Sequence, residues 1–173
     1  ATVRGMGVAI AGLVTQDTGV LLTSPNLLAW YHTPIKAIFE RELQLPVCVG
    51  NDATLAALGE YKFGAGKGCH DLIYITVSTG IGGGVITGGK LLLGTSGFAA
   101  EVGHMTIDIN GPRCNCGNIG CLEVLASGTA IARFAAERLS RGEKSAISEL
   151  VSGDLGKITA EIEEKAARAG DAV

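Results

Sequence analysis

Positive charge and long apolar runs are both scarce in this sequence. Lysine and arginine together number 14 against 17 acidic residues, and the net charge is −3. Without a basic patch, the chain has little electrostatic attraction for nucleic acid. Apolar runs such as Leu72–Val77 are far shorter than the ~20 residues that span a bilayer, and no targeting segment opens the sequence. We expect a soluble, cytoplasmic protein that in this stretch binds neither nucleic acid nor membrane.

An initiator methionine is also absent, since the chain opens Ala1-Thr2-Val3-Arg4 and closes just past an amphipathic helix. We therefore expect a piece of a longer protein. Glycine, by contrast, is abundant: 26 of 173 residues, about twice its usual share. Because periodic apolar segments persist throughout, disorder and a collagen-like chain are excluded, and the glycines are expected in turns and loops.

Three of the five cysteines fall close to a histidine, at His104, Cys114, Cys116 and Cys121. Thiolates and an imidazole are the usual donors of tetrahedral zinc, and four protein ligands leave no open position, so we expect a structural ion. Gly117 and Gly120 suit the tight turns of a zinc knuckle over residues 101–123.

The alternative to a metal site is a disulfide with a spare thiol. An odd number of cysteines without a secretory signal favours zinc. Cys48 and Cys69 stand apart from the cluster, and we interpret both as structural.

Hydrophobic patterning predicts an α/β fold. In the first half we expect a buried strand over Val8–Val14, interrupted by Gly12, that returns through a turn into Val20–Leu22. A helix capped by Thr33 with Pro34 at its first position should follow and end before Pro46. Three further elements are expected in order: a strand at Val47–Val49, a helix at Ala53–Tyr61 and a strand at Leu72–Val77.

The remainder of the chain is expected to be helical. One helix starts at Ser127 or Gly128, a second lies around Ile147, and Thr159 caps a third that stops at Gly170. The predicted apolar positions are Ile131, Phe134, Ala135, Leu139, Ile147, Leu150 and Val151. Composition thus divides the chain into a sheet-rich part, 1–126, and a helical part, 127–173.

The segment Ser78–Gly84 contains four glycines and two hydroxyl residues between two strands. Backbone amides in such a loop can converge on phosphate oxygens, with positive φ turning the N–H groups inward. A glycine-rich hairpin turn without a ligand is equally consistent with this pattern. The segment lacks the lysine of a Walker loop and the helix that should follow it.

Asn51 and Asp52 follow a strand directly and precede a helix, where α/β folds place their ligands. Either residue could simply cap the helix. The functional alternative is that Asp52 accepts a hydroxyl proton while Asn51 positions the same substrate. Glu101, His104 and Glu123 could likewise hold a polyol through several hydrogen bonds, or be ordinary surface groups.

Four stretches in sequence resemble the successive signatures of the ROK proteins (repressors, open reading frames, kinases). They are Asn51-Asp52-Ala53, Thr79-Gly80-Ile81-Gly82-Gly83-Gly84, Glu101-Val-Gly-His104, and Cys114-x-Cys116-Gly-x-x-Gly-Cys121-x-Glu123. The resemblance covers about Val8 to Gly170. It implies an actin-like, hexokinase-type ATPase fold with a ribonuclease H-like motif, in which a sugar lies between two α/β domains.

By this resemblance Asp52 is the general base of an ATP-dependent sugar kinase, most simply a glucokinase. Hexose would be held by Asn26, Asn51, Asp52, Glu101, His104 and Glu123. The phosphates of ATP, bound with Mg²⁺, would face Thr79, Gly80, Gly82 and Gly83, and zinc would bind His104 and the three cysteines. Relatives commonly form dimers or tetramers, so a homo-oligomer is expected.

Departures from the family pattern limit these expectations. The first phosphate loop, Asp-x-Gly-x-Thr, and the later adenosine segment are absent, so the fragment alone should be inactive. Thr54, where relatives carry asparagine, and the altered first turn over Gly7–Val14 leave N-acetylhexosamine, fructose or allose as other substrates. The sequence also leaves polyphosphate open as another phosphoryl donor. A sugar-responsive repressor with its DNA-binding domain outside this stretch, or a zinc-stabilised sugar-binding protein without catalysis, would share these signatures.

Overall fold

The structure is a computed structural model that describes residues 2–172, and it divides into two compact units. The first unit comprises the residues up to Thr76 together with Gly82–Glu101. The second comprises Val77–Ile81 together with the residues from Val102 onward. The boundary at residue 126 that composition suggested remains a prediction.

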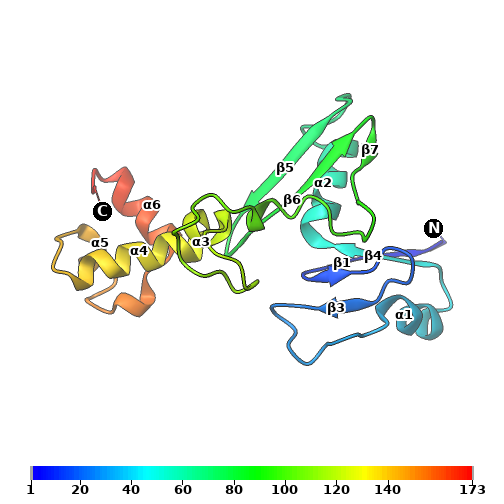
Figure 1. The fold of residues 1–173 in the computed structure, drawn as a ribbon, viewed down its shortest axis with the longest axis horizontal. Coiled ribbons are helices and arrows are strands. Elements are labelled where there is room, and N and C mark those ends of the chain that lie inside the picture. Colours follow the sequence, from blue (N-terminus) through cyan, green and yellow to red (C-terminus); the bar gives the residue numbers. More distant parts are fainter. Residues whose placement is uncertain (1, 173) are drawn as a thin grey trace. The chain divides into compact units, whose positions relative to one another are not determined.

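The first unit begins with a parallel pair of strands. β1 (Met6–Ile10) pairs in register with β4 (Val47–Asn51), from Met6 opposite Val47 to Ile10 opposite Asn51 (Figure 1). Between them the chain forms a hairpin of β2 (Leu13–Val14) and β3 (Leu21–Thr23), then helix α1 (Ile35–Leu43). Their core is Val14, Leu21 and Ile35, with Val8, Ile10, Phe39 and Val49 packed against it.

The interruption at Gly12 that the sequence predicted within Val8–Val14 is confirmed, because β1 ends at Ile10 and β2 starts at Leu13. At Gly12, φ is 136°, and a Cβ there would lie 2.3 Å from the Thr23 carbonyl oxygen. Only glycine tolerates this conformation and this approach. The break lets β1 pair with β4 and leaves β2 to form the hairpin.

Helix α1 starts one residue later than predicted. Pro34 rather than Thr33 is the residue before the helix, and no side chain caps it. Thr33 instead exchanges two backbone hydrogen bonds of 2.9 Å with Leu21. This extended pairing holds Thr33 in the sheet and removes it from the cap. The predicted end before Pro46 is confirmed, since the residue after Leu43 has left-handed backbone.

Helix α2 (Asp52–Phe63) follows β4 without a loop, and a three-stranded sheet comes next, with β6 (Ile81–Thr87) between β5 (Leu72–Val77) and β7 (Lys90–Leu91). The glycines of β6 lie against α2. A Cβ on Gly82 would be 2.8 Å from the Ala53 Cβ, and one on Gly84 would be 2.5 Å from the Ala57 Cβ. The glycines therefore allow close packing of helix on strand.

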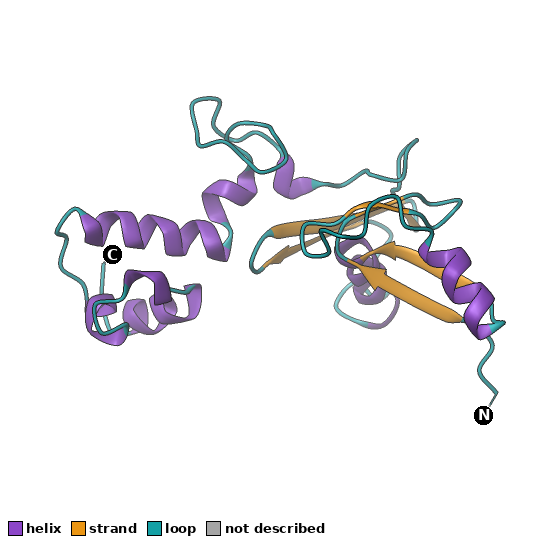
Figure 2. Ribbon diagram, turned by 90° about the horizontal axis from the view of Figure 1, so that it is seen from below, coloured by secondary structure: helices purple, strands orange, loops and turns teal. Residues whose placement is uncertain are grey.

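The second unit is helical, with a long loop region before α3 (Figure 2). Its elements are η1 (Val102–His104), α3 (Leu122–Ala126), α4 (Gly128–Ser140), α5 (Ala146–Leu150), η2 (Leu155–Lys157) and α6 (Ala160–Arg168). Ser127 caps α4 and Thr159 caps α6 through their side chains, as the sequence predicted. The core consists of Ala135, Leu139, Ile147, Val151, Ile158 and Ala166.

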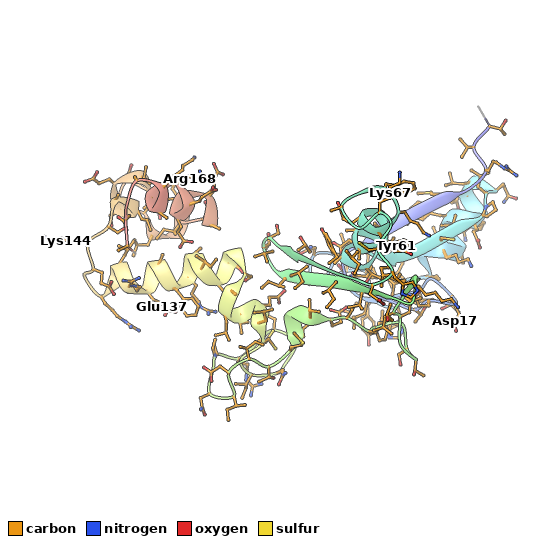
Figure 3. All side chains as sticks on the ribbon, turned by 90° about the horizontal axis from the view of Figure 1, so that it is seen from above. Asp17, Tyr61, Lys67, Glu137, Lys144 and Arg168 are labelled. Carbon is orange, nitrogen blue, oxygen red and sulfur yellow. The ribbon has the colours of Figure 1, made fainter. Side chains whose placement is uncertain are left out.

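Of the predicted apolar helix positions, Ala135, Leu139, Ile147 and Val151 lie in the core, whereas Ile131, Phe134 and Leu150 are 41, 37 and 51% exposed. Because the second unit has few helices, each helix packs against its neighbours on one side only and leaves the other side exposed. Charged side chains such as Glu137 on α4 and Arg168 on α6 occupy outer positions (Figure 3). Within residues 2–172, no helix combines the length and apolar character needed to span a membrane.

Candidate functional site

Asn51 is fixed on both sides at the corner between β4 and α2. Its Oδ1 accepts a hydrogen bond of 3.0 Å from the Thr54 N–H, and its Nδ2 donates one of 3.2 Å to the Gly12 carbonyl. The capping role considered from the sequence is thus confirmed for Asn51. The same two bonds hold its amide in a defined orientation.

Asp52 is the first residue of α2 and its side chain is exposed. Its Oδ1 accepts a 2.9 Å hydrogen bond from the N–H of the next residue, Ala53. A carboxylate in the first turn of a helix interacts favourably with the helix dipole, so Asp52 suits its position at the start of α2. It is a group that could accept a proton.

Two other predicted sugar residues lie elsewhere in the first unit. Asn26 is exposed on a loop after the buried Ser24, whose Oγ accepts hydrogen bonds from the N–H groups of Asn26 and Leu27 at 3.3 and 3.2 Å. Glu101 is half-buried and follows Ala100, which has a positive φ of 68°.

The predicted metal ligands lie together in the second unit. The ligand atoms of His104, Cys114, Cys116 and Cys121 are all within 4.8 Å of one another. His104 Nδ1 is 3.7 Å from Cys114 Sγ, and Cys116 Sγ is 3.7 Å from Cys121 Sγ. Tetrahedral zinc with Zn–S bonds of about 2.3 Å would hold two sulfurs about 3.8 Å apart. The donor set and its spacing fit such an ion.

The 3.7 Å between the Cys116 and Cys121 sulfurs is too long for a disulfide, whose S–S bond is about 2.05 Å. All five cysteines are free. The disulfide alternative is therefore wrong for this structure. Cys48 and Cys69, interpreted as structural, are both exposed.

Glycine geometry in the cluster agrees with the sequence prediction. Gly117 and Gly120 have φ of 95° and 61°. A Cβ at Gly120 would lie 1.6 Å from the Asp108 carbonyl oxygen, which no shift of a flexible side chain could relieve. The turn that brings Cys121 back to the other ligands depends on that close approach.

The thiols of the cluster have opposite proton affinities. Burial raises the pKa of Cys121 to about 12, whereas a backbone hydrogen bond from Asn118 lowers the pKa of Cys116. A protonated, buried Cys121 must lose its proton to become a metal ligand. Metal affinity at this cluster should therefore rise with pH.

The predicted glycine loop, Ser78–Gly84, is shorter in the structure. Only residues 78–80 form the turn, and Ile81 onward belongs to β6. Within the described residues, no glycine from 78 to 84 has positive φ, so that part of the prediction is wrong. Gly82 is accounted for by its contact with α2, and the candidate phosphate amides reduce to those of Thr79 and Gly80.

The carbonyl groups of this turn are all engaged. Ser78 accepts a 2.8 Å hydrogen bond from the Gly128 N–H, and Gly80 accepts one of 2.9 Å from the Ser78 N–H. The Thr79 carbonyl accepts a 2.7 Å hydrogen bond from the Thr129 hydroxyl. By contrast, within residues 2–172 the N–H groups of Thr79 and Gly80 have no hydrogen-bond partner. The turn thus presents two adjacent donors.

Glu123 is closer to this turn than the sequence suggested. Its Oε2 accepts a 2.9 Å hydrogen bond from the Ile81 N–H, and a Cβ at Gly80 would lie 2.4 Å from that oxygen. Gly103, next to His104, packs so tightly that a Cβ would be 2.0 Å from the Ile81 carbonyl oxygen. The second unit therefore brings together Thr79, Gly80 and Glu123.

Sequence reasoning missed the contribution of Thr129. Its only local signal is a hydroxyl at the second position of a helix capped by Ser127, a pattern that ordinarily concerns the helix itself. The acceptor on Thr79 is fifty positions earlier in the chain. No periodicity or spacing in the sequence connects the two.

The sequence matches the ROK family over residues 1–173. A glucokinase from Halalkalibacterium halodurans is 43% identical over 169 residues, which cover 97% of this chain and 51% of that protein. A xylose repressor from Bacillus subtilis is 44% identical over 127 residues, which cover 73% of this chain and 33% of that protein.

Among solved structures, a ROK family glucokinase from Streptomyces griseus in complex with glucose and AMPPNP superposes with a TM-score of 0.85. It is 42% identical and is matched over 99% of this chain and 55% of its own. The chain belongs to the ROK family. It has the actin-like, hexokinase-type fold of ROK sugar kinases, as the sequence predicted, and it spans about half the length of these glucokinases.

Proposed function

We propose that the whole protein is an ATP-dependent sugar kinase of the ROK family that phosphorylates a hexose, with glucose as the preferred substrate. The observation that carries this proposal is the turn after β5. Its carbonyls are sequestered while two adjacent N–H groups, on Thr79 and Gly80, lack partners. Two adjacent backbone N–H donors suit phosphate oxygens. The similarity to a glucokinase crystallised with glucose and AMPPNP supports the same ligands.

On the sugar side, we assign Asp52 as the general base. Its exposed carboxylate would accept the proton of the attacking hydroxyl as that oxygen bonds to the γ-phosphorus. Asn51 keeps its amide oriented through the bonds to Thr54 and Gly12, so its remaining N–H can position the same sugar. We assign the further sugar contacts to Asn26, Glu101, His104 and Glu123.

On the phosphate side, Thr79 and Gly80 would donate their N–H groups to the transferred phosphoryl oxygens. Bound with ATP, Mg²⁺ would neutralise part of the charge on those oxygens. Gly82 and Gly83 lie on β6, and we assign them to the walls of the nucleotide site rather than to direct donation. Catalysis in this scheme is mostly positioning.

We propose zinc as the ion of the His104, Cys114, Cys116 and Cys121 cluster. Its four ligands would give it a structural role, since none of its positions is left for substrate. His104 directs Nδ1 towards Cys114, which leaves Nε2 to bond a sugar hydroxyl. By fixing His104, the cluster would also fix the short η1 helix and the approach to Glu101.

A repressor is the alternative function, and the 44% identity to a xylose repressor favours it to the same degree on sequence alone. Asp52 argues for the kinase, because a sugar sensor does not need a base at that corner. The upstream sequence discriminates between them: an Asp-x-Gly-x-Thr strand indicates the kinase and a DNA-binding helical domain the repressor. Cytoplasmic localisation and a dimeric or tetrameric assembly remain predictions.

The test is ADP release by the full-length protein with a panel of hexoses, N-acetylhexosamines and fructose, comparing wild type with Asp52→Asn. The amide retains the hydrogen bond from Ala53 but cannot take a proton, so kcat should fall by about 10²- to 10⁴-fold while the KM for sugar changes little. Glu42→Gln, an exposed carboxylate on α1 paired with Arg41, is the matched control and should retain full turnover. Near wild-type turnover of Asp52→Asn would refute the assigned base.

A further inference from the structure

The first residues of α4 donate hydrogen bonds to the turn after β5. Their acceptors are the Ser78 and Thr79 carbonyls, the two carbonyls of this turn that are not bonded within the turn itself. The Gly128 N–H donates to the Ser78 carbonyl at 2.8 Å, and the Thr129 hydroxyl donates to the Thr79 carbonyl at 2.7 Å. Ser127 Oγ lies 3.0 Å from the Thr129 hydroxyl oxygen and also accepts from the Ala130 N–H. The hydroxyl of Thr129 is therefore held by its own helix cap.

Because the peptide group is planar, these contacts to the carbonyls also fix the directions of the neighbouring N–H donors. In a trans peptide, the carbonyl of one residue and the N–H of the next lie in one plane and point in opposite directions. The peptide between Thr79 and Gly80 has its oxygen bound to Thr129, so its Gly80 N–H must face the other way. In the same manner, the hydrogen bond from Gly128 to the Ser78 carbonyl fixes the direction of the Thr79 N–H.

We propose that Thr129 is a positioning residue for phosphate binding: by holding the Thr79 carbonyl, its hydroxyl aims the Gly80 N–H at the phosphates of the nucleotide. This inference rests on the proposed kinase function, because it needs the turn to bind phosphate. Thr129 does not touch the nucleotide. Without its hydroxyl, the peptide between Thr79 and Gly80 can rotate, and its carbonyl oxygen can then face the anion.

Two features leave the orientation of the peptide between Thr79 and Gly80 dependent on a hydrogen bond from outside the turn. Gly80 has no side chain to restrict its backbone, and the Glu123 carboxylate occupies the place where a Cβ would lie. The peptide on the other side of Gly80 is fixed separately, through Ser78 and Glu123. Thr129 alone holds the Thr79 carbonyl in the described part of the chain. Loss of the Thr129 hydroxyl should therefore change the direction of the Gly80 N–H.

The experiment compares Thr129→Val with Thr129→Ser in the full-length protein. Valine keeps the shape and removes the hydroxyl, whereas serine restores the hydroxyl. We expect Thr129→Val to weaken ATP binding about five- to tenfold, the equivalent of one well-placed hydrogen bond, as measured by calorimetry and by the KM for ATP. The KM for sugar should stay within about twofold, and Thr129→Ser should recover most of the affinity for ATP.

Ser140→Ala is the matched control, because it removes a 2.8 Å hydroxyl-to-carbonyl bond at the far end of the same helix. It should leave the affinity for ATP unchanged. If Thr129→Val is as stable as wild type and binds ATP equally well, the positioning role is refuted while the kinase proposal stands. If wild type itself binds no ATP, the kinase proposal fails first. If Thr129→Val weakens the binding of sugar and of ATP equally, the inference is also overturned, because that result would indicate a general structural defect.

Discussion

In the first unit, Asn51 and Asp52 stand where a strand passes straight into a twelve-residue helix, whereas in the second unit the cysteines and His104 stand on loops and short helical turns. Asn51 is held by two hydrogen bonds to backbone that belongs to regular elements or their edges. The cysteine cluster has little regular structure of its own. Without an ion, only weak contacts through sulfur, such as those of 3.7 Å at Cys114 and Cys116, join the side chains of the cluster. We therefore expect the second unit to need an ion and the first unit to need none.

The largest expected effect comes from breaking the metal cluster. Cys121→Ala removes a fully buried ligand, and we expect loss of bound zinc and a destabilisation of the second unit of at least about 3 kcal/mol. Hydrogen exchange followed by residue should show faster exchange at Ile81 and along α3, with the β4 to α2 corner unchanged.

The control is Cys48→Ala, an exposed thiol in the first unit that should retain the full metal content. Chelation of the wild-type protein should reproduce the exchange pattern of Cys121→Ala. Retention of one zinc per chain by Cys121→Ala would contradict the prediction that only the second unit needs an ion. Hydrogen exchange that accelerates equally in both units would contradict it as well.

A smaller effect is expected from Asn51. Asn51→Ala removes both the cap of α2 and the bond to Gly12, and should cost about 1 to 2 kcal/mol in the free energy of unfolding. Asn51→Asp keeps the acceptor for the Thr54 N–H and loses only the donor, so it should cost less. Urea denaturation measures both values.

The matched variant in the second unit is Thr159→Ala, which removes the cap of α6. The metal content should remain complete in all three proteins. If Asn51→Asp proves as destabilising as Asn51→Ala, the cap contributes little and the bond to Gly12 is what holds the corner.

The smallest effect concerns Glu163 on α6. Both of its carboxylate oxygens are shielded from solvent without a hydrogen-bond partner among the described residues, and burial raises its pKa above the ordinary value. The folded protein therefore binds this proton more tightly than the unfolded chain, so the charge destabilises the fold above the raised pKa, and acidification through that pKa removes the penalty.

Glu163→Gln should raise the melting temperature at pH 7 by about 1 to 2 °C, with the gain disappearing as the pH falls towards 4. Glu164→Gln is the control, because Glu164 is paired with Arg168 at 2.6 Å and its replacement should bring no gain. A gain for Glu163→Gln that is the same at both pH values would show that charge is not the cause.

Local signals in the sequence predicted the elements that carry most of the candidate site. The caps at Ser127 and Thr159, the strand Leu72–Val77 and the grouping of His104 with three cysteines were all evident, because a cap, an alternating strand and a cluster of donor residues are each encoded over few residues. The same motifs indicated the ROK family, which the match over residues 1–173 confirms.

Features that depend on distant partners could not be predicted in this way. The position of Thr33 outside the cap of α1 depends on its pairing with Leu21. The attachment of Glu123 to Ile81 joins positions that no sequence pattern relates. Glycines 82 and 84 looked like part of a phosphate loop, because the helix against which they pack is not visible in a linear pattern.

The glycine and alanine contacts between β6 and α2 have a practical consequence for mutagenesis of the corner that bears Asn51 and Asp52. With Ala53 and Ala57 facing Gly82 and Gly84, no space remains for a larger side chain at any of the four positions. A bulkier residue would tilt α2 and swing Asp52 with it. Mutant libraries should therefore leave these four codons constant and vary Thr54, which shares the corner with Asn51.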